Sequence, residues 1–100
     1  MVAAAVSNFG CLDIAIANTG ITTFGNFFEY QPYSMKALLE VNLFGTFFLA
    51  QVAAKQMILQ GQGGSVLLTS SVTGHAAHPD LAAYGMTKAG IDQLAKNLII

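Results

Sequence analysis

Two short apolar runs, each bounded by turn-forming residues, constrain the fold of this chain more than any other feature. The first run covers residues 12–17 and stops at an Asn-Thr-Gly turn, and the second covers residues 65–70 after a glycine-rich segment. Short, mostly apolar runs between turn residues are typical of strands buried on both faces of a parallel sheet. Since parallel strands require a long crossover, usually helical, residues 18–64 are expected to hold a helix.

Two helices are predicted from the residues at their ends. Residues 21–33 read as a loop, and Ser34 is expected to cap a helix over residues 35–60, because its oxygen can accept from free backbone N–H groups. A glycine-rich segment beginning at Gly61 ends that helix. Asp80 is expected to cap a last helix that runs to the C-terminus. The order strand, helix, strand, helix with a right-handed crossover predicts α/β architecture.

The composition is unusually apolar for a chain of this length. Of the 100 residues, 54% are hydrophobic and only 9% are charged. A free-standing domain of this size needs more polar surface. The excess predicts either a piece from the interior of a larger domain or a subunit that covers its surface with partners. Because both predicted helices are apolar nearly all round, we expect a homo-oligomer, a dimer or tetramer joined through these helices.

Charge, cysteine content and hydropathy exclude several partners and locations. The net charge of −1 and only four Lys and Arg residues leave no basic patch for nucleic acid. Cys11 is the single cysteine, so an internal disulfide is impossible, a reducing compartment is favoured, and the residue reads as a small buried hydrophobic side chain. The N-terminal residues lack the positive flank of a signal peptide. Polar residues interrupt the longest apolar stretches, which argues against a membrane span and favours a cytoplasmic protein.

Tyr84 and Lys88 form the pattern that indicates chemistry. Residues four apart lie on one face of a helix, so both side chains can contact one ligand. An ammonium group near a phenol favours the phenolate and lowers the tyrosine pKa from its usual value of about 10, which suits proton exchange near neutral pH. Ser71, thirteen residues upstream, could hold the oxygen that gains or loses this proton. The combination predicts carbonyl or alcohol chemistry, against the alternative of a half-buried tyrosine beside a solvated lysine.

Further polar positions are candidates for the same site. Asn42 lies in a run of Val, Leu and Phe, and a buried amide there must find partners or cost roughly 1–3 kcal/mol, which favours a polar site over a helix-surface role. Side-chain alternation allows only one of Ser70 and Ser71 to face the tyrosine. Asn18 and Gly20 follow a predicted strand at the edge where open α/β sheets bind ligands, although a simple strand-ending turn explains them equally well.

His75 and His78 invite a metal interpretation. Two ligands three apart, with only Asp80 nearby, do not complete a site, so we expect no metal ion and expect these histidines to line the mouth of a substrate site. The glycines of segment 61–64 precede a strand instead of opening a helix, so they do not form a phosphate-binding loop.

Four motifs in order resemble the short-chain dehydrogenase/reductase family, whose members are NAD(P)-dependent oxidoreductases on a Rossmann-like sheet. The first strand and its Asn-Thr-Gly ending resemble the family's strand ending in N-A-G, with Thr19 in place of Ala. Residues 41–45 resemble its V-N-x-x-G helix, residues 64–71 its strand leading to the active-site serine, and residues 84–88 its Y-x-x-x-K. The resemblance implies that residues 1–100 are the central, catalytic part of one incomplete domain, a β-α-β-α portion of the parallel sheet.

The resemblance also implies a role for each catalytic residue. Tyr84 would be the acid/base that exchanges a proton with the substrate oxygen during hydride transfer. Lys88 would activate Tyr84 and hydrogen-bond the nicotinamide ribose. Ser71 would hold and polarise the substrate oxygen, and Asn42 would orient a water that connects Lys88 with solvent. The substrate would be a small-molecule alcohol or carbonyl compound.

Cofactor binding in this family also uses a Gly-rich loop that does not occur in this sequence. Asn18 and Gly20, together with Tyr84 and Lys88, would be the contacts of this segment with NAD or NADP. The missing loop predicts that the isolated 100 residues have no oxidoreductase activity. Two other functions stay open: a non-catalytic dinucleotide-sensing or assembly module of the same fold, and a helical interaction fragment. The complete quartet of catalytic residue types favours the enzyme.

Overall fold

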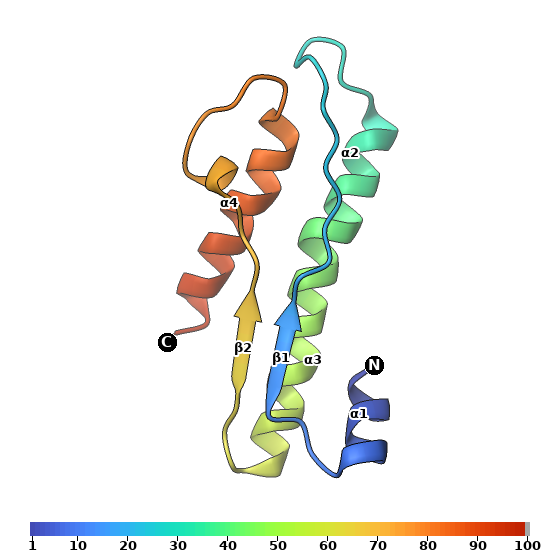
Figure 1. Cartoon of the computed structure of the whole chain (residues 1–100), viewed down its shortest axis with the longest axis vertical. Helices are drawn as coiled ribbons and strands as arrows, with labels where there is room; N and C mark the ends of the chain where they lie inside the picture. The colour runs from blue at the N-terminus through green and yellow to red at the C-terminus, as the bar shows by residue number, and fades with distance from the viewer. Residues whose placement is uncertain (100) are drawn as a thin grey trace.

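The computed structural model describes residues 1–99 of the chain. Two strands and the long helices run side by side along the longest axis of a molecule of 49 × 25 × 15 Å (Figure 1). The elements are α1 (Val2–Phe9), β1 (Ile14–Ala17), α2 (Pro32–Leu38), the π-helical turn η1 (Leu39–Phe44), α3 (Gly45–Gln60), β2 (Ser65–Leu68), the 3₁₀ turn η2 (Val72–Gly74) and α4 (Ala82–Asn97). The strands and the later helices were expected from the sequence, whereas α1 was not.

The two strands form the predicted parallel pair. Their register runs from Ile14 opposite Ser65 to Ala17 opposite Leu68. The ladder continues one step further, because the Thr69 N–H donates to the Ala17 carbonyl at 3.1 Å. The helices α2 and α3 carry the chain from the carboxyl end of β1 back to the start of β2, so the α/β crossover is confirmed (Figure 1).

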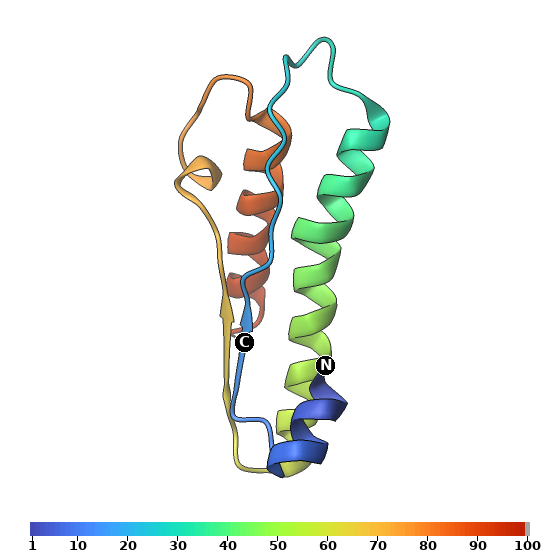
Figure 2. The ribbon, with the colours of Figure 1, turned by 45° about the vertical axis from the view of Figure 1, so that its right-hand side comes forward.

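Helices cover one face of the sheet and leave the other open. Ala15 and Ala17 are buried, and Ala15 packs with Ala53 and Met57 of α3. On the opposite face Ile16 is 58% exposed. Figure 2 shows α3 and α4 on the same side of the strand pair. Small side chains on the covered face let the helix approach closely, whereas the large ones on the open face are free to pack against further elements.

The start of the first long helix differs from the prediction, because proline sets it. α2 begins at Pro32, after Gln31 in extended conformation. Proline has a fixed φ and no N–H, so it fits the first helical position, where a donor would have no intrahelical partner. Ser34 therefore lies inside the helix and is not its cap, and the loop predicted over residues 21–33 ends before Pro32.

The predicted Asp80 cap is also wrong. α4 begins at Ala82, and Leu81 precedes it at the cap position. Asp80 has a left-handed φ of 59°, and its carbonyl accepts a hydrogen bond from the Gly25 N–H at 3.0 Å. The backbone conformation of Asp80 thus serves a contact with a distant loop instead of capping the helix.

The continuous helix Pro32–Gln60 is long and apolar enough, by length and composition alone, to cross a membrane. The polar residues that argued against a membrane span therefore do not interrupt the stretch enough to fail this test, although one such helix is weak evidence for a span. The core helix of a soluble fold passes the same test, and this helix buries Ala53 against the sheet and the polar Asn42 against neighbouring elements. It ends as predicted at Gly61, which has a left-handed φ of 73°.

Candidate active site

The predicted site residues come from four segments that meet near the carboxyl ends of the strands. Asn18 and Gly20 follow β1, and Ser71 follows β2. Tyr84 and Lys88 lie in the first half of α4, while Asn42 lies in the π-helical turn η1. In open α/β sheets this edge is the usual place for a ligand.

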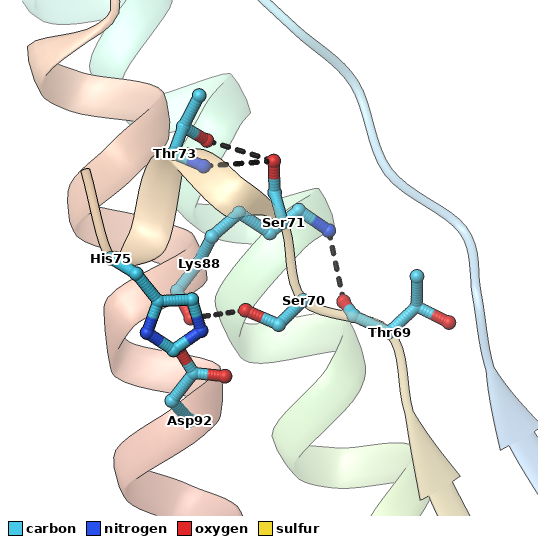
Figure 3. A network of polar contacts seen from close by, with 7 residues as sticks. All are labelled: Thr69, Ser70, Ser71, Thr73, His75, Lys88 and Asp92. Carbon is cyan, nitrogen blue, oxygen red and sulfur yellow. Dashed lines mark hydrogen bonds and ion pairs between the residues drawn. The ribbon is translucent and has the colours of Figure 1, made fainter. Parts of the chain in front are cut away.

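Lys88 is the central side chain of the site. It is only 4% exposed, and its Nζ donates a hydrogen bond to the Thr69 carbonyl at 3.1 Å (Figure 3). The same nitrogen lies 5.7 Å from the centre of the Tyr84 ring, so the predicted pairing of the two residues is present in space. An ammonium group has three N–H donors, so the Thr69 carbonyl leaves two for other acceptors.

Asn42 is fully buried, and its amide forms two hydrogen bonds with the backbone of Ile21, a pair that we call the bracket. Its Oδ1 accepts from the Ile21 N–H at 2.8 Å, and its Nδ2 donates to the Ile21 carbonyl at 2.8 Å. Nδ2 also donates to the Thr87 hydroxyl at 3.3 Å. Polar partners were expected for this buried amide, but the sequence did not indicate that they would be backbone groups of the loop after β1.

Gly20 lies where Lys88 and Asn42 converge. A Cβ at this position would lie 3.4 Å from Lys88 Nζ and 3.5 Å from Asn42 Oδ1. These are ordinary contact distances, so a methyl group would fit but would place an apolar surface against an amine and an amide. The backbone of this loop therefore lies close to both polar groups, with no side chain between them.

The two consecutive serines point to different partners, as strand alternation predicts. Ser70 Oγ donates to the Lys88 carbonyl at 3.1 Å, which fixes it against α4 (Figure 3). Ser71 Oγ instead accepts from the Thr73 hydroxyl at 2.9 Å and from the Thr73 N–H at 3.3 Å. Because both of these bonds are accepted, the Ser71 hydroxyl proton is left to donate to a ligand.

Asn18 lies beside a cavity at the end of β1. Its Oδ1 accepts from the Thr69 hydroxyl at 2.9 Å, which links the ends of the two strands. The cavity has a volume of about 310 Å³, and Asn18, Thr19 and Val41 are among its lining residues. Thr69 was missed by the sequence analysis, although its hydroxyl contacts Asn18 and its carbonyl contacts Lys88.

His75 and His78 line a separate cavity of about 390 Å³ between the loop after η2 and α4. His75 Nε2 lies 3.2 Å from Asp92 Oδ2 of α4. Among residues 1–99, no three His, Cys, Asp or Glu side chains gather as metal ligands would. The role of these histidines at a substrate mouth stays a prediction.

Comparison with known proteins decides the family. The sequence model of the family described as short chain dehydrogenase matches residues 1–99. The chain belongs to the short-chain dehydrogenase family. The expected resemblance is therefore confirmed, and the site described above lies in a family member.

Relatives of this chain include an "L-rhamnose 1-dehydrogenase (NAD(P)(+))" of Sphingomonas sp. (strain SKA58). That relative is 36% identical over 99 residues, which cover 99% of this chain and 39% of the relative. A solved gluconate 5-dehydrogenase from Burkholderia cenocepacia J2315, in complex with NADP and tartrate, matches with a TM-score of 0.90. Its sequence identity is 32%, over 97% of this chain and 38% of that one.

A second solved structure is a short-chain type dehydrogenase/reductase from Mycobacterium marinum. It matches with a TM-score of 0.95 and 29% identity, over 98% of this chain and 40% of that one. The chain thus spans about two fifths of the length of these relatives. The structural matches confirm the Rossmann-like fold, and two of the three relatives carry NAD(P) or NADP in their descriptions, in agreement with the predicted cofactor class.

Among the described residues, Cys11 is the one whose side-chain pKa clearly departs from its ordinary value. Its Sγ lies 3.5 Å from Asp13 Oδ2, and the side chain is partly exposed, which corrects the expectation of a buried hydrophobic residue. The hydrogen bond to the Asp13 carboxylate, its negative charge and a small loss of solvation all raise the pKa of the Cys11 thiol. A raised pKa means that less thiolate is present at any given pH.

Replacing Asp13 by Asn should lower the Cys11 pKa toward its ordinary value and so increase the thiolate fraction at pH 8. We expect alkylation of Cys11 by iodoacetamide to become several-fold faster, as measured by mass spectrometry of the native protein, since the thiolate is the nucleophile. Glu29→Gln, which removes an exposed carboxylate elsewhere, is the matched control and should leave the rate unchanged. Equal rates in Asp13→Asn and the wild type would contradict the assignment.

Replacing Asn42 by Leu should leave the Ile21 N–H and carbonyl without their side-chain partners. We expect the free energy of unfolding of the full-length protein to fall by about 2–4 kcal/mol. The reason is that the two Ile21 groups would give up water on folding and find no hydrogen-bond partner in its place. Urea denaturation measures the change. The exposed Asn8, replaced by Leu, is the control and should alter stability by less than about 0.5 kcal/mol. A similar small change for Asn42→Leu would show that the bracket on Ile21 does not stabilise the fold.

Proposed function

We propose that this chain is the central, catalytic part of an NAD(P)-dependent oxidoreductase that interconverts an alcohol and a carbonyl compound. The observation that carries the proposal is the position of Lys88. Its buried ammonium lies 5.7 Å from the Tyr84 ring and is anchored by a neutral carbonyl, at the edge of the sheet where α/β enzymes bind their ligands. Family membership and the NAD(P) or NADP in the descriptions of two relatives support the same conclusion.

Proton transfer is the part of the reaction that this segment performs. Tyr84 donates its phenolic proton to the substrate oxygen in reduction and takes it back in oxidation. The Lys88 amine, 5.7 Å from the centre of the Tyr84 ring, stabilises negative charge that develops on the phenol oxygen during this exchange. Ser71 donates its hydroxyl proton to the same substrate oxygen, because its own acceptor sites are filled by Thr73.

The residues near β1 fit a dinucleotide. The nicotinamide supplies or accepts the hydride when the cofactor is bound. Lys88 retains N–H donors for ribose hydroxyls, and Gly20 lets the backbone approach them closely. The cavity beside Asn18, Thr19 and Val41 has room for another part of the same ligand. The amide of Asn42 holds this loop directly through two hydrogen bonds to Ile21. In this proposal Asn42 also orients a water that connects Lys88 with solvent.

The substrate is a small-molecule alcohol or carbonyl compound, and the protein is cytoplasmic in this proposal. Relatives are described as acting on L-rhamnose and gluconate, which makes sugar-derived alcohols the first compounds to test. The isolated segment is expected to be inactive, because β1 and β2 leave one sheet face open, with Ile16 largely exposed.

Replacing Tyr84 by Phe in the full-length protein should remove the proton donor and leave the fold and the lysine in place. We expect kcat to fall by roughly 10²–10⁴-fold, measured by nicotinamide absorbance with sugar and secondary alcohol substrates. Cofactor affinity, measured by fluorescence titration, should stay within a few-fold. Tyr33→Phe, at a tyrosine that is 76% exposed, is the control and should retain full turnover. Unchanged turnover in Tyr84→Phe would overturn the enzyme assignment and favour a dinucleotide-sensing module.

Exposed aromatic residues on α3 support the homo-oligomer that completes the proposal. Phe47 and Phe48 are 43% and 56% exposed, and their rings meet edge to face with centres 5.3 Å apart. Met86 of α4 is also exposed, so both helices present apolar surface. Such surface on a soluble protein marks a contact with a partner.

Replacing Phe48 by Glu should therefore break the assembly. We expect the full-length protein to sediment as a smaller species in analytical ultracentrifugation, because a charge would be buried in an apolar contact. Lys36→Glu, a charge reversal at an exposed position of α2, is the control and should keep the original size. An unchanged mass for Phe48→Glu would exclude this helix face from the interface.

A further inference from the structure

The loop after β1 and the start of α4 are joined by contacts that the family motifs do not include. The Gly25 N–H donates to the Asp80 carbonyl at 3.0 Å, although these residues lie far apart in the sequence. The Tyr30 ring packs on Gly25, and the Tyr30 hydroxyl hydrogen-bonds the Thr23 hydroxyl. We name the contacts among Thr23, Gly25, Tyr30 and Asp80 the loop clasp.

Two members of the loop clasp require a particular residue type. A Cβ at Gly25 would lie 2.7 Å from Tyr30 Cδ2, so a side chain at this position would push the ring away. Asp80 has φ 59°, the left-handed conformation that Asp, Asn and Gly tolerate and β-branched residues do not. The contact between the two loops therefore depends on local backbone preferences at both ends.

The loop clasp acts at the start of the helix that carries Tyr84. Leu81 follows Asp80 at the cap position and has no side-chain atom that could cap α4. On another face of the first turns, a Cβ at Gly85 would lie 2.8 Å from the Thr73 carbonyl. The beginning of α4 is thus held between the loop after β1 and the turn that follows Ser71.

We propose that the loop clasp is a positioning device for Tyr84 in the reaction of the proposed oxidoreductase, on which this inference rests. Asp80 is four residues before Tyr84, so the clasp fixes the turn from which the phenol projects. Lys88 has its own anchor at the Thr69 carbonyl, and Ile21 has its own bracket at Asn42. Loss of the clasp therefore displaces the phenol but leaves Lys88 and the backbone of Ile21 in place.

The first test compares three replacements of Asp80 in the full-length protein. Asp80→Val strains the left-handed backbone, whereas Asp80→Asn and Asp80→Gly accept it. We expect kcat of Asp80→Val to fall by about 10–100-fold, because small displacements of a reacting group have effects of this size. The KM for the cofactor should stay within about twofold, and Asp80→Asn and Asp80→Gly should keep nearly wild-type kcat.

The second test uses hydrogen exchange and does not require activity. In Asp80→Val the amides of Gly25 and of residues 82–86 should exchange faster, while the Ile21 amide, held by Asn42, should not change. If Asp80→Val fails to fold, Gly25→Ala serves in its place, since it disturbs the same contact through the Tyr30 ring. A wild-type protein without dehydrogenase activity would refute the proposed function, and the exchange data would still decide whether the clasp holds α4.

Three results would overturn the loop clasp as a positioning device. One is unchanged exchange in residues 82–86 when the clasp is broken. Another is a rise in cofactor KM that matches the fall in kcat, because that pattern means general disruption of the site. The third is an Asp80→Asn variant as impaired as Asp80→Val, because the carboxylate and not the backbone conformation would then be the active feature.

Discussion

The fold around the site depends on one requirement, that a buried ammonium group must have hydrogen-bond partners. Lys88 is almost completely buried, and an unpartnered charge there would be strongly destabilising. Thr69 supplies a carbonyl to its Nζ, and the next residue, Ser70, donates its hydroxyl to the Lys88 carbonyl. Two consecutive residues after β2 thus hold both ends of one residue on α4, so the strand end and the helix are fixed relative to each other.

A second polar side chain fixes the other strand end. The Asn42 amide accepts from the N–H and donates to the carbonyl of the same residue, Ile21, as a neighbouring strand would. The loop after β1 therefore keeps paired backbone groups after it has left the sheet. Asn42 lies in the π-helical turn η1, and the Thr46 hydroxyl donates to its carbonyl at 2.8 Å, so the irregular turn is itself supported. Such turns are frequent at functional sites.

The sequence predicted the features that depend on side-chain type. Apolar runs located both strands, and Gly61 located a helix end, because burial and left-handed backbone conformation select residue types. Ser70 and Ser71 have different hydrogen-bond partners, as alternation requires, and the choice of Ser71 for the site stays a prediction. Tyr84 and Lys88 lie together as their spacing requires.

Contacts made by backbone atoms could not be predicted in the same way. The carbonyl of Thr69 and the two polar groups of Ile21 are the same in every residue, so nothing in their side chains identifies them as partners. The start of α4 was misplaced for a related reason. Asp is a good cap and also a good left-handed residue, and only the contact with the Gly25 N–H decides between these roles.

Because Lys88 is held by a neutral carbonyl and not by a carboxylate, its positive charge is not cancelled by its hydrogen-bond partner. In the part of the chain that the structure describes, the carboxylate of Asp92 lies beside His75, while the Lys88 amine is held by a carbonyl. A carboxylate would fix the lysine equally well but would cancel most of its field at the Tyr84 ring 5.7 Å away. The carbonyl positions the amine and leaves its positive charge to act on the phenol. Holding Lys88 through the backbone carbonyl of Thr69, just after β2, therefore fixes the lysine and keeps its positive charge available to the phenol.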